Sequence, residues 1–447
     1  MKKTIFVVAM VLCSFSMVFG TIITNANQSV QYIRLPARNA STDIDAIYFN
    51  PAGLAQLSNG FHVAIHNQTI FQEKTVISSF PFLNDSTYVG EVNVPIFPTF
   101  FAVYKADRLA LSFGFGPNSG GGTADFTEGL PSFETPLSLL PAMISTMGVP
   151  TTQYSLDMAF KGKSVYYGFQ GNITYAFSET ISGAVGFRYI HARNTYEGYI
   201  KDIRVNPLHP LVNPTGDMMS AAQFFTLVGR SDIAAQVGDY EVDVQQKGSG
   251  ITPILGLNVI ASPNMNIGIR YEFNTELKLE NETTIDDTGT FPDGEKSRND
   301  IPAILSAGIE YSLLPELRVM VSFSYFFDKN ANWDKSEELI DNNTYDFGIG
   351  FEYDITDAFL VSAGYLHTQV GVMKEYQTDF SHELNSDSLT VGGRFLLTKN
   401  LDLDFGVIYV NYHDADRNIY NADVGASFLE QYQRTTWSFA FGLGYSF

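Results

Sequence analysis

The C-terminal segment of the chain alternates strictly between two kinds of residue. From Trp437 to Phe447 every odd position holds a large apolar residue, whereas every even position holds a small or polar one. A period of two residues places the two kinds of side chain on opposite faces of a β-strand. Such a strand can meet lipid with one face and a lumen with the other.

The same alternation recurs along the chain, in segments 109–115, 165–175, 267–273, 319–325, 345–353 and 401–409. A soluble β-sandwich shows the same pattern, so the connections between segments must decide. Connections of a few residues alternate with long ones such as 119–153 and 204–240. Short periplasmic turns and long outer loops alternate in this way in outer-membrane barrels. The sequence therefore predicts an all-β fold, a transmembrane antiparallel β-barrel of about 14 strands over residues 60–447.

The N-terminus carries an export signal. Met1, Lys2 and Lys3 form a positive region that precedes an apolar run over residues 4–19, so we expect a signal peptide over residues 1–20. No later stretch approaches the ~18 consecutive apolar residues that a membrane helix needs. A membrane would therefore be crossed by strands, and we expect the protein in the bacterial outer membrane.

Composition supports a membrane barrel. The chain has 36 phenylalanines and 24 tyrosines but only 17% charged residues, a balance typical of strands that face lipid on one side. The formal net charge of −21 argues against nucleic acid as a partner.

Residues 21–59 precede the first strand and form the third predicted region, an N-terminal hatch. Ser41 or Thr42 can cap a short helix, Asp43 and Asp45 would lie in its first turn near the positive end of the dipole, and Pro51 would stop it. We expect this helical segment to plug the lumen, although a helix lying against a domain fits the same residues. The predicted end of the hatch is formed by Asn50, Pro51, Ala52 and Gly53.

Two long outer loops are unexpectedly apolar. Their large residues recur at helical spacing, and such residues gain nothing in water unless they are buried. One interpretation is an adaptable landing site for an apolar ligand; the other is that the two loops pack on each other as a lid, and both can hold. The candidate capture residues are Leu137, Leu140, Met143, Ile144, Met147, Met218, Phe224 and Phe225.

A family resemblance rests on four features: Asn50–Leu54, the glycine-rich strand end at 113–122, the apolar third outer loop and the terminal Phe447. With these features the chain resembles the FadL transporters of long-chain fatty acids and hydrophobic compounds, also called the OmpP1/TodX family. The resemblance implies a 14-stranded barrel with an N-terminal hatch. It also implies ligand capture by outer-loop helices, a lumenal site, and sideways release through a gap at a kinked strand.

The residues themselves make a kink plausible, because neither proline nor a glycine run supports a regular ladder. An ordinary glycine-rich loop start is the alternative. The candidate residues for the kink and lateral gap are Gly114, Gly116, Pro117 and Gly120.

Family members that bind fatty acids use lumenal cations for the carboxylate. The corresponding positions here fall near Gly198 and Asn342, which carry no charge. The candidate substitutes are Arg188, Arg193 and Arg270, although these arginines could instead form salt bridges with Glu272, Asp346, Asp402 or Asp404.

The expected function is passive transport of long-chain fatty acids or other hydrophobic small molecules, including aromatic hydrocarbons, by a monomer in contact with outer-membrane lipid and lipopolysaccharide. We expect no enzyme activity and no cofactor. We also expect no metal site, because His62 and His66 lack a third ligand nearby. Two alternatives stay open: a shuttle in type IX secretion that binds exported proteins, and a structural or adhesive barrel.

Overall fold

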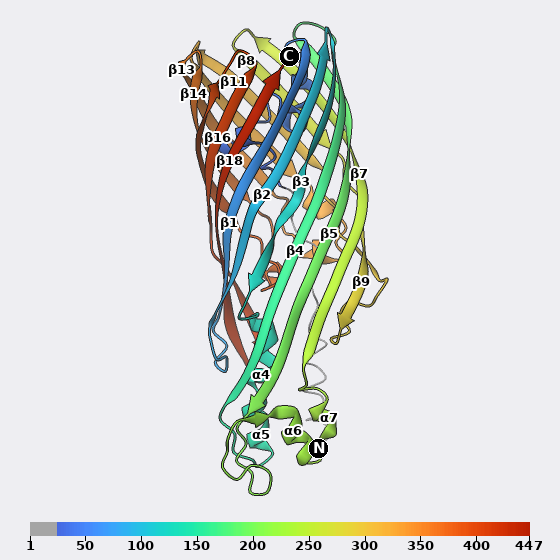
Figure 1. Ribbon diagram of the computed structural model, residues 1–447, viewed down its shortest axis with the longest axis vertical. Helices are drawn as coiled ribbons and strands as arrows, with labels where there is room; N and C mark the ends of the chain where they lie inside the picture. The colour runs from blue at the N-terminus through green and yellow to red at the C-terminus, as the bar shows by residue number, and fades with distance from the viewer. Residues whose placement is uncertain (1–24) are drawn as a thin grey trace.

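A computed structural model of the chain describes residues 25–447; the expected signal peptide lies outside them. The strands form one antiparallel sheet in which the last strand pairs with the first, so the sheet closes into a tall barrel (Figure 1). Fourteen strands build the wall, as predicted. They are β1 (Gly60–Ser78), β2 (Thr87–Ala106), β3 (Leu109–Phe126), β4 (Tyr154–Ala176), β5 (Ile181–Val205), β7 (Tyr240–Ser262), β8 (Met265–Glu272), β11 (Ile304–Leu314), β12 (Leu317–Phe326), β13 (Tyr345–Thr356), β14 (Phe359–Gln369), β15 (Ser386–Leu396), β16 (Leu401–Tyr412) and β18 (Ala426–Ser446).

The exposure of the side chains along the wall strands alternates with the predicted period of two residues. In β18 the side chains of Trp437, Phe439 and Phe441 are 46%, 43% and 64% exposed, whereas Ser438 and Ala440 are buried. Large apolar residues cover the outer face of the other strands in the same way. Such a continuous apolar surface is unfavourable in water and favourable against lipid.

The two ends of the barrel differ. At the end that holds the C-terminus the strands are joined by tight turns. At the other end several strands are much longer and continue into helical loops (Figure 1). Among the described residues no helix is both long and apolar enough to cross a bilayer. The helical turns of these loops are α4 (Pro131–Ser138), α5 (Leu140–Thr146), α6 (Ala221–Leu227), α7 (Ser231–Ala234), η2 (Asp328–Asn330), η3 (Ser336–Leu339) and η4 (Lys374–Tyr376); the short strands β6 (Met219–Ser220), β9 (Lys278–Asp286), β10 (Lys296–Arg298) and β17 (Ala415–Asn421) prolong the wall there.

The segment before β1 folds into three short turns inside the barrel: α2 (Val30–Arg34), α3 (Ala46–Phe49) and η1 (Pro51–Gln56). The predicted helix starting at Ser41 or Thr42 is wrong, because α3 begins only at Ala46. The hydroxyl of Ser41 donates to the carboxylate of Asp45 at 2.6 Å instead of capping a helix. The guanidinium of Arg38 forms ion pairs with the carboxylates of Asp43 and Asp45 at 2.7 and 2.8 Å, so these carboxylates do not accept from helix amides.

Buried charges anchor this plug to the wall. The guanidinium of Arg34 is fully buried, contacts Glu352 of β13, and lies 3.0 Å from a carboxylate oxygen of Asp404 on β16. Its backbone carbonyl accepts hydrogen bonds from Ser362 of β14 and Thr390 of β15, each at 3.2 Å. One residue of α2 therefore joins four consecutive strands, which favours a single position of the plug.

Replacing Arg34 with methionine should destabilise the barrel, because Glu352 and Asp404 lose their fully buried counter-charge and keep only the partly exposed Arg318 and Arg394. Breaking a buried ion pair on one side costs on the order of 3 kcal/mol. We expect a lower unfolding temperature, measured by the heat-dependent shift of the barrel band in SDS gels. Replacing Lys161, whose ion pair with Asp125 is about half exposed, should leave that temperature nearly unchanged. Equal effects of the two substitutions would contradict the anchoring role.

Candidate functional site

The ladder between β2 and β3 has a long interruption. Val92 pairs with Ala124, and the next paired residues are Phe100 and Phe115. Residues 93–99 of β2 and 116–123 of β3 therefore leave the ladder between these two strands. On the β2 side the interruption contains Pro95 and Pro98, which lack the N–H that a ladder needs.

The opposite side of the interruption is a kink in β3. Gly120 and Gly121 have φ angles of +63° and +138°, and the pairing of β3 with β4 slips before Ser119 and again after Gly120. A Cβ on Gly120 would lie 2.1 Å from the carbonyl oxygen of Ser164. Only glycine fits this backbone, so the kink depends on the residue type at that position.

Of the predicted kink residues, Gly116, Pro117 and Gly120 lie within the interruption and Gly114 does not. Gly114 pairs regularly with Phe101 of β2 and Gln170 of β4, so its assignment to the gap is wrong. A Cβ on Gly114 would lie 2.9 Å from Cγ2 of Ile47 in the plug. This glycine makes room for the plug rather than for a kink.

The plug supplies hydrogen-bond partners to the kinked strand. The side-chain amide of Asn25 donates to the carbonyls of Pro117 and Gly120 at 3.2 and 2.7 Å, and that of Gln28 donates to Pro117 at 2.8 Å. The backbone N–H of Asn25 donates to the carbonyl of Asn118 at 2.9 Å. Carbonyls that have lost their ladder partners on β2 are thereby satisfied from inside the barrel.

A cavity of about 510 Å³ fills the lumen between the plug and the outer loops. Tyr32 and Ile33 of the plug line it on one side, and Phe380 and His382 of the β14–β15 loop also border it. Val92, Val94, Phe97 and Gly120–Gly122 belong to its lining, so the cavity lies directly behind the interruption in the wall. Its charged side chains are Lys74, Lys163, Asp346, Glu383 and Arg434.

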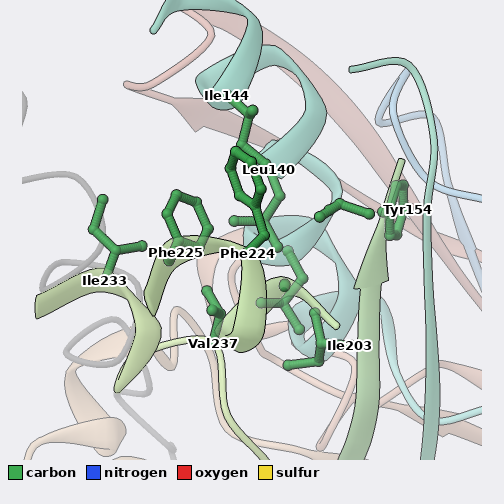
Figure 2. Packing of buried hydrophobic residues seen from close by; sticks show 11 residues of the cluster. Leu140, Ile144, Tyr154, Ile203, Phe224, Phe225, Ile233 and Val237 are labelled. Carbon is green, nitrogen blue, oxygen red and sulfur yellow. The ribbon is translucent and has the colours of Figure 1, made fainter. Parts of the chain in front are cut away.

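The apolar outer loops pack mainly on each other. Figure 2 shows Phe224 and Phe225 of α6 against Leu140 and Ile144 of α5 in a buried cluster that includes Tyr154, Ile203, Ile233 and Val237. Phe224, Phe225 and Ile144 are 0% exposed. The interpretation as a lid therefore describes these residues, and they offer no open landing surface. Met143 packs against the cluster, Met218 is partly buried, and Met147 is 40% exposed.

An apolar groove lies beside this lid. It is small, about 60 Å³, and of the predicted capture residues only Leu137 lines it. Phe133, Ile200 and Phe291 are among its other walls, while Phe160 and Tyr196 line both the groove and the lumenal cavity. The rings of Phe133 and Phe160 pack on that of Phe380 at 5.6 and 5.1 Å. A cluster of aromatic rings thus separates the groove from the cavity.

The predicted lumenal arginines do not reach the cavity as free cations. Arg188 lies 2.6 Å from Glu272 and Arg270 lies 3.2 Å from it, and both guanidinium groups stack on the ring of Tyr48 in the plug at 4.6 and 4.9 Å. The salt-bridging alternative therefore describes these two residues. Arg193 is exposed on the outer face and donates to Gln245 at 2.8 Å, so its placement in the lumen is wrong. A one-residue shift along a strand changes the face, and its inward neighbours are Ala192 and Asn194.

The hatch residues at 50–53 are buried and form hydrogen bonds with β4, β5 and β7. The amide of Asn50 donates to the carbonyl of Ser41 at 3.0 Å and to Asn258 at 2.7 Å. The carbonyls of Pro51 and Ala52 accept from Thr174 at 2.6 Å and from Ser182 at 2.8 Å. A Cβ on Gly53 would lie 2.4 Å from the carbonyl oxygen of Ser41. Each of these residues thus has a contact that fixes the plug.

His62 and His66 serve the structure. His62 contacts the hydroxyl of Ser446 and the carbonyl of Ser58, each at 2.8 Å, and His66 accepts from the backbone of Val30 at 3.5 Å. Within residues 25–447, no group of three or more His, Cys, Asp or Glu side chains is arranged to hold a metal ion.

Sequence reasoning missed the β2 side of the interruption and the three cations of the cavity, Lys74, Lys163 and Arg434. Pro95 and Pro98 within an otherwise strand-like run were a readable signal, because proline is excluded from central strands. The three cations were not singled out, because nothing in the local sequence shows which face of a strand meets a cavity.

The chain matches no protein-family model and no curated protein. Solved structures with the same fold include a FadL homologue of Pseudomonas aeruginosa, with 13% identity over 96% of this chain and 100% of that one and a TM-score of 0.63. The toluene transporter TodX of P. putida has 14% identity over 91% of this chain and 95% of that one, with a TM-score of 0.58. The CymD monoaromatic hydrocarbon channel has 14% identity over 96% and 98%, with a TM-score of 0.52. The predicted resemblance is confirmed at the level of the fold.

Replacing Gly120 with alanine should destabilise the protein more than the same substitution at another glycine of positive φ, because the added Cβ also clashes with Ser164. Gly148 is the matched control, because its φ is +89° and a Cβ there meets nothing within 4 Å. We expect Gly148→Ala to cost about 1 kcal/mol and Gly120→Ala distinctly more, since it adds a clash with Ser164. Thermal unfolding of both variants in detergent gives the comparison; equal losses would show that the close contact has no effect.

Proposed function

We propose that this protein is a passive route for hydrophobic small molecules across the bacterial outer membrane, with long-chain fatty acids or aromatic hydrocarbons as cargo. The observation that carries the proposal is the interruption between β2 and β3 beside a lumenal cavity. The shared fold with the FadL homologue and with structures described as toluene and monoaromatic hydrocarbon channels supports it. The barrel would act as a monomer, surrounded by lipid and lipopolysaccharide.

Cargo would first meet the apolar groove beside the lid. A groove lined by Phe133, Leu137 and Phe291 favours apolar molecules, because contact with them removes apolar surface from water. The aromatic cluster formed with Phe160 and Phe380 lies between the groove and the cavity. Aromatic side chains move by rotation about two bonds, so a small ring movement would join the two spaces.

The exit would be sideways into the membrane. On the far side of the cavity the described part of the plug fills the lumen with buried side chains and ion pairs, so that direction is closely packed. The interruption leads instead to the lipid-facing surface, where Ile96 is 71% exposed. An apolar molecule gains free energy by entering lipid rather than water, so this direction needs no energy source.

The ring of Phe97 closes the exit. It is 2% exposed, and a Cβ on Gly121 would lie 2.5 Å from its Cε2, so the ring covers the glycine backbone. On the β3 side no ladder holds this segment, because residues 93–99 are unpaired with β3, whereas β1 still pairs with Phe97. Movement of Phe97 is therefore the step that would open the wall.

A disulfide across the interruption should stop transport. A Cβ on Gly122 would lie 2.7 Å from Cγ2 of Val94, so Val94→Cys with Gly122→Cys places two thiols close together across the gap. The only cysteine of the sequence is Cys13, within the expected signal peptide, so no other thiol should compete. Uptake of radiolabelled oleate and toluene by bacteria that make the oxidised variant should fall to background and return after reduction.

The matched control is a disulfide where the wall is already intact. Val103 and Ser112 are paired directly in the β2–β3 ladder, so Val103→Cys with Ser112→Cys joins the same strands without crossing the gap. Its oxidation should leave uptake unchanged. Undiminished uptake through the oxidised Val94–Gly122 variant would rule out the lateral exit.

A further inference from the structure

Two cations face the cavity at the seam where the barrel closes. Lys74 of β1 and Arg434 of β18 are direct partners in the ladder that joins the first strand to the last. Both line the lumenal cavity, so their side chains lie on the same face of the wall. Directly opposed residues of an antiparallel pair have Cβ atoms about 5 Å apart, which brings the two positive charges within reach of one anion.

These cations are incompletely paired. Arg434 donates to the backbone carbonyl of His382 and stacks over the ring of Tyr412 at 5.1 Å, while its Nε is buried and has no partner among the described residues. The ammonium group of Lys74 makes no hydrogen bond or ion pair with any described residue. Burying a positive group without a full set of hydrogen-bond partners costs free energy, so binding of an anion between Lys74 and Arg434 would be favoured.

The acidic residue nearest to the two cations is Glu383 of the β14–β15 loop, and it forms no close ion pair with either of them. One of its carboxylate oxygens lies 3.9 Å from Nη1 of Arg434, beyond hydrogen-bond distance. Burial raises the pKa of Glu383, and the attraction of Arg434 and Lys74 does not offset that effect. The other acid of the cavity, Asp346, accepts from Thr368 of β14 at 2.7 Å and belongs to a different part of the wall.

The surroundings of the pair fit an amphiphile. Thr436 and Ser438 continue the inward face of β18 beside Arg434, and the hydroxyl of Ser438 is buried without a partner among residues 25–447. At the interruption the cavity is lined by apolar side chains, notably Val92, Val94 and Phe97. A head group at the seam would leave an apolar tail directed along this wall.

From these contacts we propose that Lys74 and Arg434 form a subsite for the anionic head group of an amphiphilic cargo, a long-chain carboxylate, with Glu383 as the internal group it displaces. This inference rests on the proposed function and narrows its cargo. The subsite differs from the positions suggested by the family resemblance: Gly198 lines the outer groove and Asn342 is exposed in a loop. Selection among hydrophobic molecules would then depend on charge at the seam, not on the groove.

The test compares binding of oleate with that of oleyl alcohol, which has the same tail and no charge, to the full-length protein in detergent. Lys74→Met should weaken oleate binding about tenfold or more, the usual effect of losing one charge-assisted contact, and should change oleyl alcohol binding less than about twofold. Lys74 is the better position to vary, because Arg434 also holds the loop at His382. The heat-dependent shift in SDS gels verifies that each variant is folded.

Two further variants separate the subsite from a general positive potential. Lys163→Met removes a cation that lines the same cavity from β4 and should leave oleate binding nearly unchanged. Glu383→Gln removes the internal competitor and should strengthen oleate binding several-fold. Equal losses for both ligands in Lys74→Met, or an equal loss of oleate binding in Lys163→Met, would overturn the assignment.

Binding of the three ligands to the unsubstituted protein distinguishes a failure of the anionic subsite from a failure of the proposed function. If it binds toluene or oleyl alcohol but discriminates against oleate, the anionic subsite is refuted and the hydrophobic route stands. If it binds none of the three ligands, the proposed function itself fails.

Discussion

Every backbone N–H and C=O in a wall that faces lipid needs a partner, because the bilayer core offers none. A closed ladder satisfies this requirement, and β1 pairs with β18 along 17 residue positions to complete it. The same requirement makes any interruption of the ladder conspicuous. At the kink in β3 the missing ladder bonds are replaced from inside by Asn25 and Gln28 of the plug. The plug and the break in the wall are therefore one structural unit, and the cavity lies where the two meet.

Ion pairs hold the plug against the wall, and most charged residues of the lumen take part in them. Arg34 and Arg38 of the plug take carboxylates from the plug and the wall, and Arg188 and Arg270 of the wall stack on Tyr48 of the plug. Such buried charges need near-complete pairing, which leaves them unable to serve a ligand. Lys74 and Arg434 differ because they lie beyond the plug, in the part of the lumen that the cavity occupies.

The outer loops show how one apolar composition can serve two purposes. Most of their large residues form the core of the lid, which packs α5 and α6 together at the end of the barrel opposite the C-terminus. The surface left for a ligand is narrower and lies beside that core, where rings of Phe133, Phe160 and Phe380 meet. A closely packed lid next to an aromatic cluster would suit the proposed role, in which apolar molecules are admitted and water is excluded.

Much of the fold was readable from the sequence, because the two-residue period and the alternating loop lengths follow directly from residue order. Barrel class, strand number, an inner hatch ending at Asn50–Gly53 and a weak point at Gly116–Gly120 all came from such local patterns. Local patterns could not say that Gly114 accommodates Ile47, that Arg193 faces outward or that Phe224 and Phe225 are buried within a lid. Those outcomes depend on which face of a strand or helix meets which distant segment. Register and packing between residues far apart in the chain decide this, and only the closed barrel brought Lys74 beside Arg434.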